Sequence, residues 1–225
     1  MTLPAELRGG LIVSAQAWRG SALDDPKIIA AMARAAQDGG AVAVRIEGEE
    51  NLRATRSRVQ LPIVGLIKRE YPGFEPYITP TLAEVGAIIG SGAEIVAFDA
   101  TARPRPDGST ILDVVTAVHA AGRLAMADCA SAQEAEAAAA AGADVLATTL
   151  CGYTPPTIGR ALPALDLVAA IALLGRFTVC EGGVRSPADL RAALRAGADA
   201  VVVGSAITSV DWLVREFAGA ADGGS

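Results

Sequence analysis

A lysine and a glutamate are the residues of this chain best suited to acid–base chemistry, because each follows directly on an apolar run. Lys68 closes the run IVGLIK, and Glu181 comes directly after FTVC. The pKa of a lysine among other charges can move from about 10.4 toward neutrality, which lets it act as a base. Two such groups on opposite faces of one carbon could invert its configuration. We therefore predict that Lys68 and Glu181 form a catalytic pair.

Other apolar runs also end in polar side chains, namely Gln16, Arg45, Glu47, Asp99 and Asp128. Several charges that converge on one place are costly if they serve only stability, so we interpret them as a substrate site. Within this site, Asp128 would orient and charge-balance either Lys68 or Arg45.

Glycine-rich segments after the last two apolar runs are typical of a phosphate site. EGGVRSP contains Gly182 and Gly183, and VGSAITS contains Gly204 and Ser205. Backbone N–H groups and the start of a short helix often bind phosphate in such loops, and glycine lets the backbone approach closely. Because the net charge of the chain is −6, an anionic substrate needs such a local attraction.

Eight apolar runs, separated by alanine-rich segments with helical spacing, must position these residues. The runs span 10–16, 41–47, 63–68, 95–100, 123–129, 144–150, 177–183 and 200–206. Runs that are apolar throughout are typical of parallel strands covered on both faces. A helix-ending glycine also recurs at intervals of 52, 50 and 55 residues, as in a barrel of four double units. We predict an α/β fold, a single-domain (β/α)8 TIM barrel over residues 1–225 with its active site at the C-terminal strand ends; an open doubly wound sheet is the alternative.

The composition restricts the class of protein further. With 225 residues, 52% of them hydrophobic, the chain is too apolar to be disordered. No uncharged apolar stretch is long enough for a membrane span, and the negative net charge argues against nucleic acid as the main partner. The first residues lack the features of a secretory signal, and the three cysteines have no CxxC spacing. These features predict a reduced, cytoplasmic compartment.

We expect neither a metal ion nor an organic cofactor. The one histidine, His119, lies in a helical segment away from the predicted mouth of the barrel. Asp99 and Asp128 have no further ligands at metal-binding spacing, and no GxGxxG motif follows the first strand. The sequence leaves the oligomeric state open, a homodimer included.

Taken in order, several motifs resemble the N-acetylmannosamine-6-phosphate 2-epimerase family. They are GLIVSAQ, AVAVRIEGEEN, PIVGLIKREYPGFEPYITPT, AFDATARPRPDG, LAMADC, TTLCGYT, EGGVRSP and VGSAIT. The resemblance covers about residues 9–209. It implies an enzyme of amino-sugar and sialic acid catabolism that converts N-acetyl-D-mannosamine 6-phosphate to N-acetyl-D-glucosamine 6-phosphate without a cofactor.

The resemblance also implies roles for individual residues. The family's acid–base pair falls on Lys68 and Glu181, and its substrate-mouth residues on Gln16, Arg45 and Asp128. Arg103 lies where relatives also have an arginine, and Tyr153 belongs to the TTLxGYT motif. With these residues, a base would remove the C2 proton of the open-chain sugar and an acid would return a proton to the other face of the enolate.

Three positions depart from the family pattern. Many relatives have serine in place of Cys151, a basic or polar residue in place of Gly183, and an arginine in place of Ser209. The last departure bears on phosphate affinity and on substrate identity. Three alternatives therefore stay open: a class I aldolase with Lys68 as its Schiff base, another phosphosugar isomerase or epimerase, and a non-catalytic barrel that binds phosphometabolites.

Overall fold

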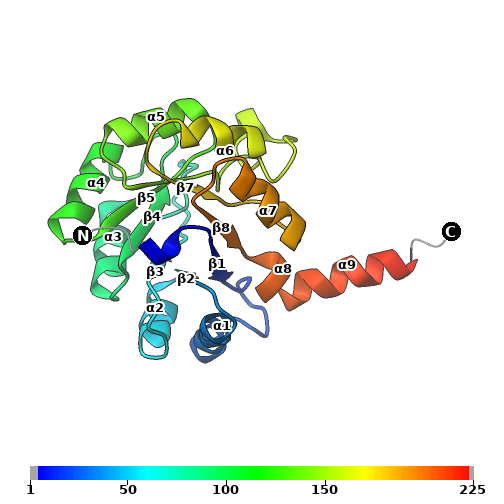
Figure 1. Cartoon of the computed structure of the whole chain (residues 1–225). Helices are drawn as coiled ribbons and strands as arrows, with labels where there is room; N and C mark the ends of the chain where they lie inside the picture. The colour runs from blue at the N-terminus through cyan, green and yellow to red at the C-terminus, as the bar shows by residue number, and fades with distance from the viewer. Residues whose placement is uncertain (1–4, 223–225) are drawn as a thin grey trace.

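Eight parallel strands close into a barrel in the order in which they occur along the chain. The computed structural model describes residues 5–222. The barrel joins β1 to β2 and so on to β8, which pairs again with β1 (Figure 1). The strands are β1 Gly10–Ala15, β2 Ala43–Glu47, β3 Ile63–Leu66, β4 Ile95–Asp99, β5 Leu124–Asp128, β6 Val145–Ala147, β7 Phe177–Cys180 and β8 Ala200–Val203. The predicted (β/α)8 barrel is confirmed.

Helices follow the strands and surround the barrel (Figure 1). They are α1 Pro26–Asp38, α2 Glu49–Arg56, α3 Leu82–Gly90, α4 Ile111–Ala120, α5 Ala132–Ala140, α6 Leu165–Ala172, α7 Pro187–Arg195, α8 Ser205–Thr208 and α9 Val210–Asp222, with short 3₁₀ turns at Ala5–Leu7 and Pro155–Thr157. Side-chain caps fix several helix starts, as Thr81 does for α3 and Ser186 for α7. Within residues 5–222, no helix is both long and apolar enough to cross a membrane.

Each strand buries both of its faces, which explains why the runs are apolar throughout. One set of alternate side chains packs in the barrel interior: Ile12, Ala43, Val64, Leu66, Ile95, Ala97, Leu124, Met126, Val145, Ala147, Phe177, Val179, Ala200 and Val202. The other set packs against the helices, as Val44, Ile46 and Phe98 do. The interior is thus a filled core, and polar side chains have space only where this core ends.

Seven of the eight strands end earlier than the sequence predicts, and β2 ends at Glu47 as predicted. Gln16, Lys68 and Glu181 lie just beyond β1, β3 and β7, and β6 has only three residues. Pairing ends there because the chain turns outward into the loops. These side chains therefore extend from the first loop residues above the core.

The loop after β3 folds into a small hairpin that fixes the position of Lys68. Lys68 and Ile78 form an antiparallel bridge, and the backbone N–H of Thr79 donates to the carbonyl of Ile67 at 2.7 Å. Arg105, from the loop after β4, donates to the carbonyls of Thr79 (2.5 Å) and Asp99 (2.8 Å). The hairpin is therefore tied to the neighbouring loop, which limits the movement of Lys68.

Candidate active site

The polar side chains at the mouth continue the inward rows of the interior core. Arg45 comes two residues after Ala43, and Asp128 two residues after Met126. Because side chains alternate along a strand, residues two positions apart share a face. The same step leads from Val179 to Glu181. The sequence therefore directs these charged groups to one place at the top of the barrel.

Arg45 is the centre of the site, and its guanidinium group joins two carboxylates. Nη1 and Nη2 donate to the two oxygens of Asp128 at 3.1 and 2.7 Å, and Nη1 also donates to Oε2 of Glu181 at 2.6 Å. The side chains of Arg45 and Asp128 are 1% and 0% exposed, and that of Glu181 is 15% exposed. Of the two partners that the sequence allowed for Asp128, the structure selects Arg45.

Two adjacent threonines at the end of β6 hold Glu181. The Thr149 hydroxyl lies 2.6 Å from Oδ1 of Asp128 and 3.2 Å from Oε2 of Glu181. The Thr148 hydroxyl donates to the carbonyl of Glu181 (2.8 Å) and accepts from its backbone N–H (3.0 Å). Thr148 thus fixes the backbone of Glu181, whereas Thr149 contacts its carboxylate.

Lys68 has its own hydrogen-bonded chain on the β1 side of the mouth. Its Nζ donates to Oε1 of Gln16 at 2.7 Å, and Nε2 of Gln16 donates to the hydroxyl of Ser14 at 2.8 Å. The backbone N–H of Lys68 donates to Glu47 at 3.1 Å. Gln16 therefore orients the ammonium group of Lys68.

The environment moves the pKa values of both predicted catalytic groups toward neutrality. Desolvation and the charge of Arg45 lower the pKa of Lys68, against the opposing effect of Glu47 and the other carboxylates. Burial and the neighbouring Asp128 raise the pKa of Glu181 from 4.5 to about 7, although Arg45 and the Thr149 hydroxyl oppose this shift. The shift of Lys68 thus favours its neutral, basic form, and Glu181 can take up and release a proton near neutral pH.

Arg103 lies beside this network on the loop after β4. It donates to Asp99 (2.7 Å) and to the Thr101 hydroxyl (2.9 Å). Burial and the charges of Asp128 and Asp99 raise the pKa of Tyr77, which lies on the β3 hairpin. Tyr77 and Thr149 were not predicted, because neither closes an apolar run of the sequence. Both, however, lie in motifs that carry the family resemblance, FEPYITPT and TTLCGYT.

The glycines of the loops after β7 and β8 have different structural surroundings. Gly183 has a φ of +70°, and a Cβ there would lie 2.3 Å from Cβ of Leu162, so both conformation and packing require glycine. Gly204 lies against Ser14, and Ser205 begins α8. Tyr153 is 56% exposed and borders Gly182 at the rim of the mouth. Packing against Leu162 thus explains the absence of a larger side chain at position 183.

Ser209 is buried and precedes α9, where its hydroxyl accepts from the backbone N–H of Trp212 at 3.3 Å. The indole of Trp212 lies under the guanidinium group of Arg185, with Cζ 5.5 Å from the ring centroid. Arg185 is the one basic residue in segments 181–186 and 204–209. It brings a positive charge close to the position where the family pattern has an arginine.

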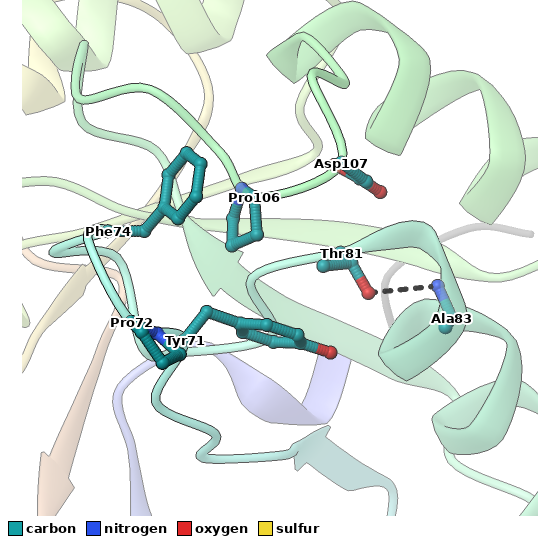
Figure 2. A pocket seen from close by; sticks show the side chains of 7 residues that line it. All are labelled: Tyr71, Pro72, Phe74, Thr81, Ala83, Pro106 and Asp107. Carbon is teal, nitrogen blue, oxygen red and sulfur yellow. Dashed lines mark hydrogen bonds between the residues drawn. The ribbon is translucent and has the colours of Figure 1, made fainter.

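A pocket of about 370 Å³ lies beside the β3 hairpin rather than at the mouth. Figure 2 shows its lining side chains, with Tyr71, Pro72 and Phe74 on one side and Thr81, Ala83 and Asp107 on the other. None of the predicted site residues is among those that line it. Within residues 5–222, no cluster of three or more His, Cys, Asp or Glu side chains is arranged to hold a metal ion.

The family model described as "Putative N-acetylmannosamine-6-phosphate epimerase" matches residues 29–222. This chain belongs to the N-acetylmannosamine-6-phosphate epimerase family. Two relatives are each named "Putative N-acetylmannosamine-6-phosphate 2-epimerase". The one from Synechococcus elongatus is 46% identical and aligns over 94% of this chain and 93% of its own length. The one from Salmonella agona is 49% identical, with 90% and 87% covered.

Solved structures place the barrel in the same family. The N-acetylmannosamine-6-phosphate 2-epimerase from Clostridium perfringens superposes with a TM-score of 0.92 at 39% identity, and the match covers 95% of this chain and 94% of that one. A thiamine phosphate pyrophosphorylase from Pyrococcus furiosus, 18% identical with a TM-score of 0.62, shares the fold only. For this member of the N-acetylmannosamine-6-phosphate epimerase family, the resemblance seen in the motifs is confirmed.

Proposed function

We propose that this enzyme inverts C2 of N-acetyl-D-mannosamine 6-phosphate to give N-acetyl-D-glucosamine 6-phosphate, a reaction of amino-sugar and sialic acid catabolism. The observation that carries the proposal is the pair of acid–base groups at one mouth. Lys68 has a lowered pKa, and Glu181 has a pKa of about 7. Their surroundings therefore favour a neutral amine at Lys68 and a carboxyl group at Glu181 that can hold a proton near neutral pH.

The chemistry follows from the acidity of the C2 proton, which is high only beside a carbonyl group. The pyranose must first open to its aldehyde. Neutral Lys68 then removes the C2 proton, the electron pair forms the enolate, and protonated Glu181 returns a proton to the opposite face. Arg45 and Asp128 balance the charge that develops during this exchange, and Gln16 orients the Lys68 amine.

The phosphate group of the substrate would lie against the loops after β7 and β8. Backbone N–H groups of Gly182, Gly183, Gly204 and Ser205 are the donors that we assign to it. Arg103 and Tyr153, from neighbouring loops, would contact the sugar at the rim. The net charge of −6 repels an anion at long range, so these local donors must supply the attraction.

The activity is tested by proton NMR of N-acetylmannosamine 6-phosphate incubated with the enzyme and a chelator. We expect signals of N-acetylglucosamine 6-phosphate to grow until both epimers are present. Lys68→Met, run beside the native chain, should leave the substrate unchanged. If the native chain leaves the substrate unchanged as well, or cleaves it into smaller carbonyl compounds, the proposal is wrong.

A homodimer is the second part of the proposal, and it rests on α9. This helix projects from the side of the barrel (Figure 1). Val210, Val214 and Phe217 recur at helical spacing along it and are exposed, Phe217 to 76%. Two copies that pair through this stripe would cover both stripes in a single two-fold contact. A cytoplasmic location is the third part of the proposal. It is supported by Cys129, Cys151 and Cys180, which are buried and form no disulfide.

Sedimentation of the purified chain tests the dimer. Phe217→Ser should convert a dimer into a monomer, whereas Leu112→Ser, which removes an exposed apolar side chain from α4, should leave the mass unchanged. A monomeric native chain, or a dimer that tolerates Phe217→Ser together with Val214→Ser, would contradict the proposed contact.

A further inference from the structure

Thr149 contacts the carboxylates of the site but has no role in the proton transfers proposed for Lys68 and Glu181. Its hydroxyl contacts Oδ1 of Asp128 and Oε2 of Glu181, and Nη1 of Arg45 contacts the same two oxygens. Arg45 can donate to both, because its nitrogen has two hydrogens. A hydroxyl has only one hydrogen, so Thr149 can donate a hydrogen bond either to Asp128 or to Glu181, but not to both at once.

The two oxygen–oxygen distances show which carboxylate accepts the Thr149 hydrogen bond in this structure. The contact with Asp128 is 2.6 Å, the length of a hydroxyl–carboxylate hydrogen bond, whereas the contact with Glu181 is 3.2 Å. With its proton on Asp128, the Thr149 oxygen presents only lone pairs to Glu181. That arrangement suits a protonated Glu181. When Glu181 has lost its proton, rotation about the Cβ–Oγ bond would let Thr149 donate to Glu181 instead.

We infer that Thr149 is a positioning residue whose rotating hydroxyl follows the protonation state of Glu181 and stabilises it most strongly as a carboxylate. The inference rests on the proposed function of Glu181. Glu181 gives its proton to the enolate carbon and so becomes a carboxylate. The Thr149 O–H then turns from Asp128 to Oε2 of Glu181, and it turns back when Glu181 is protonated again. No bond of Thr149 is made or broken beyond hydrogen bonds.

The neighbourhood of Glu181 decides what the loss of this hydroxyl does. Three charged groups face the Glu181 carboxylate: Arg45 from β2, Asp128 from β5 and Lys68 from the loop after β3. Without the hydroxyl, Arg45 remains the main stabiliser of the ionised form. The pKa of Glu181 should therefore rise in Thr149→Val, because one donor to the carboxylate is lost.

The test compares Thr149→Val with Thr149→Ser and Thr148→Val. The first variant removes the hydroxyl and the second keeps it. The third removes the neighbouring hydroxyl, which bonds to the backbone of Glu181 rather than to its carboxylate. In the pH profile of kcat/KM, the limb set by the ionisation of Glu181 should shift to higher pH by about one unit in Thr149→Val. It should stay in place in the other two. If Thr149→Val does not fold, Thr149→Ala replaces it.

A second readout does not depend on turnover. Carboxyl ¹³C chemical shifts of labelled glutamate, with the Glu181 signal identified by its loss in Glu181→Gln, report the titration of Glu181 directly. An upward shift in Thr149→Val that is absent in Thr149→Ser supports the inference even if the native chain has no epimerase activity. An unchanged Glu181 titration, or a rate lowered equally at every pH, would overturn it and leave Thr149 with a packing role.

Discussion

Replacement of Arg45 by methionine is the sharpest test of how the site is held together. Arg45 compensates two carboxylates inside the mouth, and both it and Asp128 are almost completely buried. Removal of one partner from a buried ion pair leaves an uncompensated charge and costs about 3–5 kcal/mol. Methionine keeps the aliphatic part of the side chain and removes the guanidinium group, so the substitution removes the charge together with the volume of that group. We therefore expect Arg45→Met to lower the free energy of unfolding by about 3–5 kcal/mol at pH 8.

The effect should depend on pH in a direction that the structure fixes. Arg45 lowers the pKa of Glu181, so its removal raises that pKa above its present value of about 7. The stability that protonation of Glu181 contributes is present at low pH and is lost as pH rises through its folded pKa. Because the Glu181 pKa is higher in Arg45→Met, this variant continues to lose stability up to a higher pH than the native chain. The cost of the substitution should thus be smaller at pH 5.5 than at pH 8.

Urea unfolding followed by circular dichroism measures both effects, and Arg53→Met is the matched control. Arg53 pairs with Glu49 on the exposed surface of α2, where such a pair contributes at most about 1 kcal/mol. If Arg45→Met costs no more than Arg53→Met at pH 8, Arg45 does not compensate buried charge, and the electrostatic description of the site is wrong.

Three further predictions follow from the same contacts. Lys68→Met and Glu181→Gln should each lower turnover at least ~10²-fold while circular dichroism stays native; near-normal turnover of either would remove it from the catalytic pair. Ser209→Arg should lower KM for the phosphorylated sugar and leave KM for the unphosphorylated sugar almost unchanged; an equal response of both would place residue 209 away from the phosphate. Because the folded pKa of Glu181 is raised from 4.5 to about 7, the native chain should lose stability relative to Glu181→Gln as pH rises through this interval, by up to about 3 kcal/mol; a difference that is constant with pH would contradict the shift.

The barrel and the gathering of polar side chains at its mouth could be predicted because both follow from short-range patterns. Apolar runs covered on both faces indicate parallel strands, and the closing polar residue of a run marks the mouth. Arg45, Asp128 and Glu181 are accordingly found in one hydrogen-bonded network. Strand alternation also carries enough information to place Thr149, because it lies two residues after the inward-facing Ala147.

The pairing within the site could not be predicted from the sequence. Whether Asp128 contacts Lys68 or Arg45 depends on the tilt and register of separate strands, which place Asp128 opposite Asp99 and Ala147. The need for glycine at position 183 arises from Leu162, a residue on a different loop. Likewise, the hairpin that holds Lys68 depends on Arg105, 37 residues further along the chain. Such contacts between distant segments leave no local pattern.

The central claim is that a proton is exchanged at C2, and a reaction in D₂O tests it most directly. Deprotonation beside a carbonyl lets the abstracted C2 hydrogen exchange with solvent. Inversion by carbon–carbon cleavage leaves the C2 hydrogen in place. A pair of acid–base groups that act on opposite faces of C2 predicts deuterium at C2 of the first N-acetylglucosamine 6-phosphate formed, while unreacted substrate stays largely unlabelled in proton NMR. Inversion at C2 with complete retention of the original hydrogen after several turnovers would contradict the account.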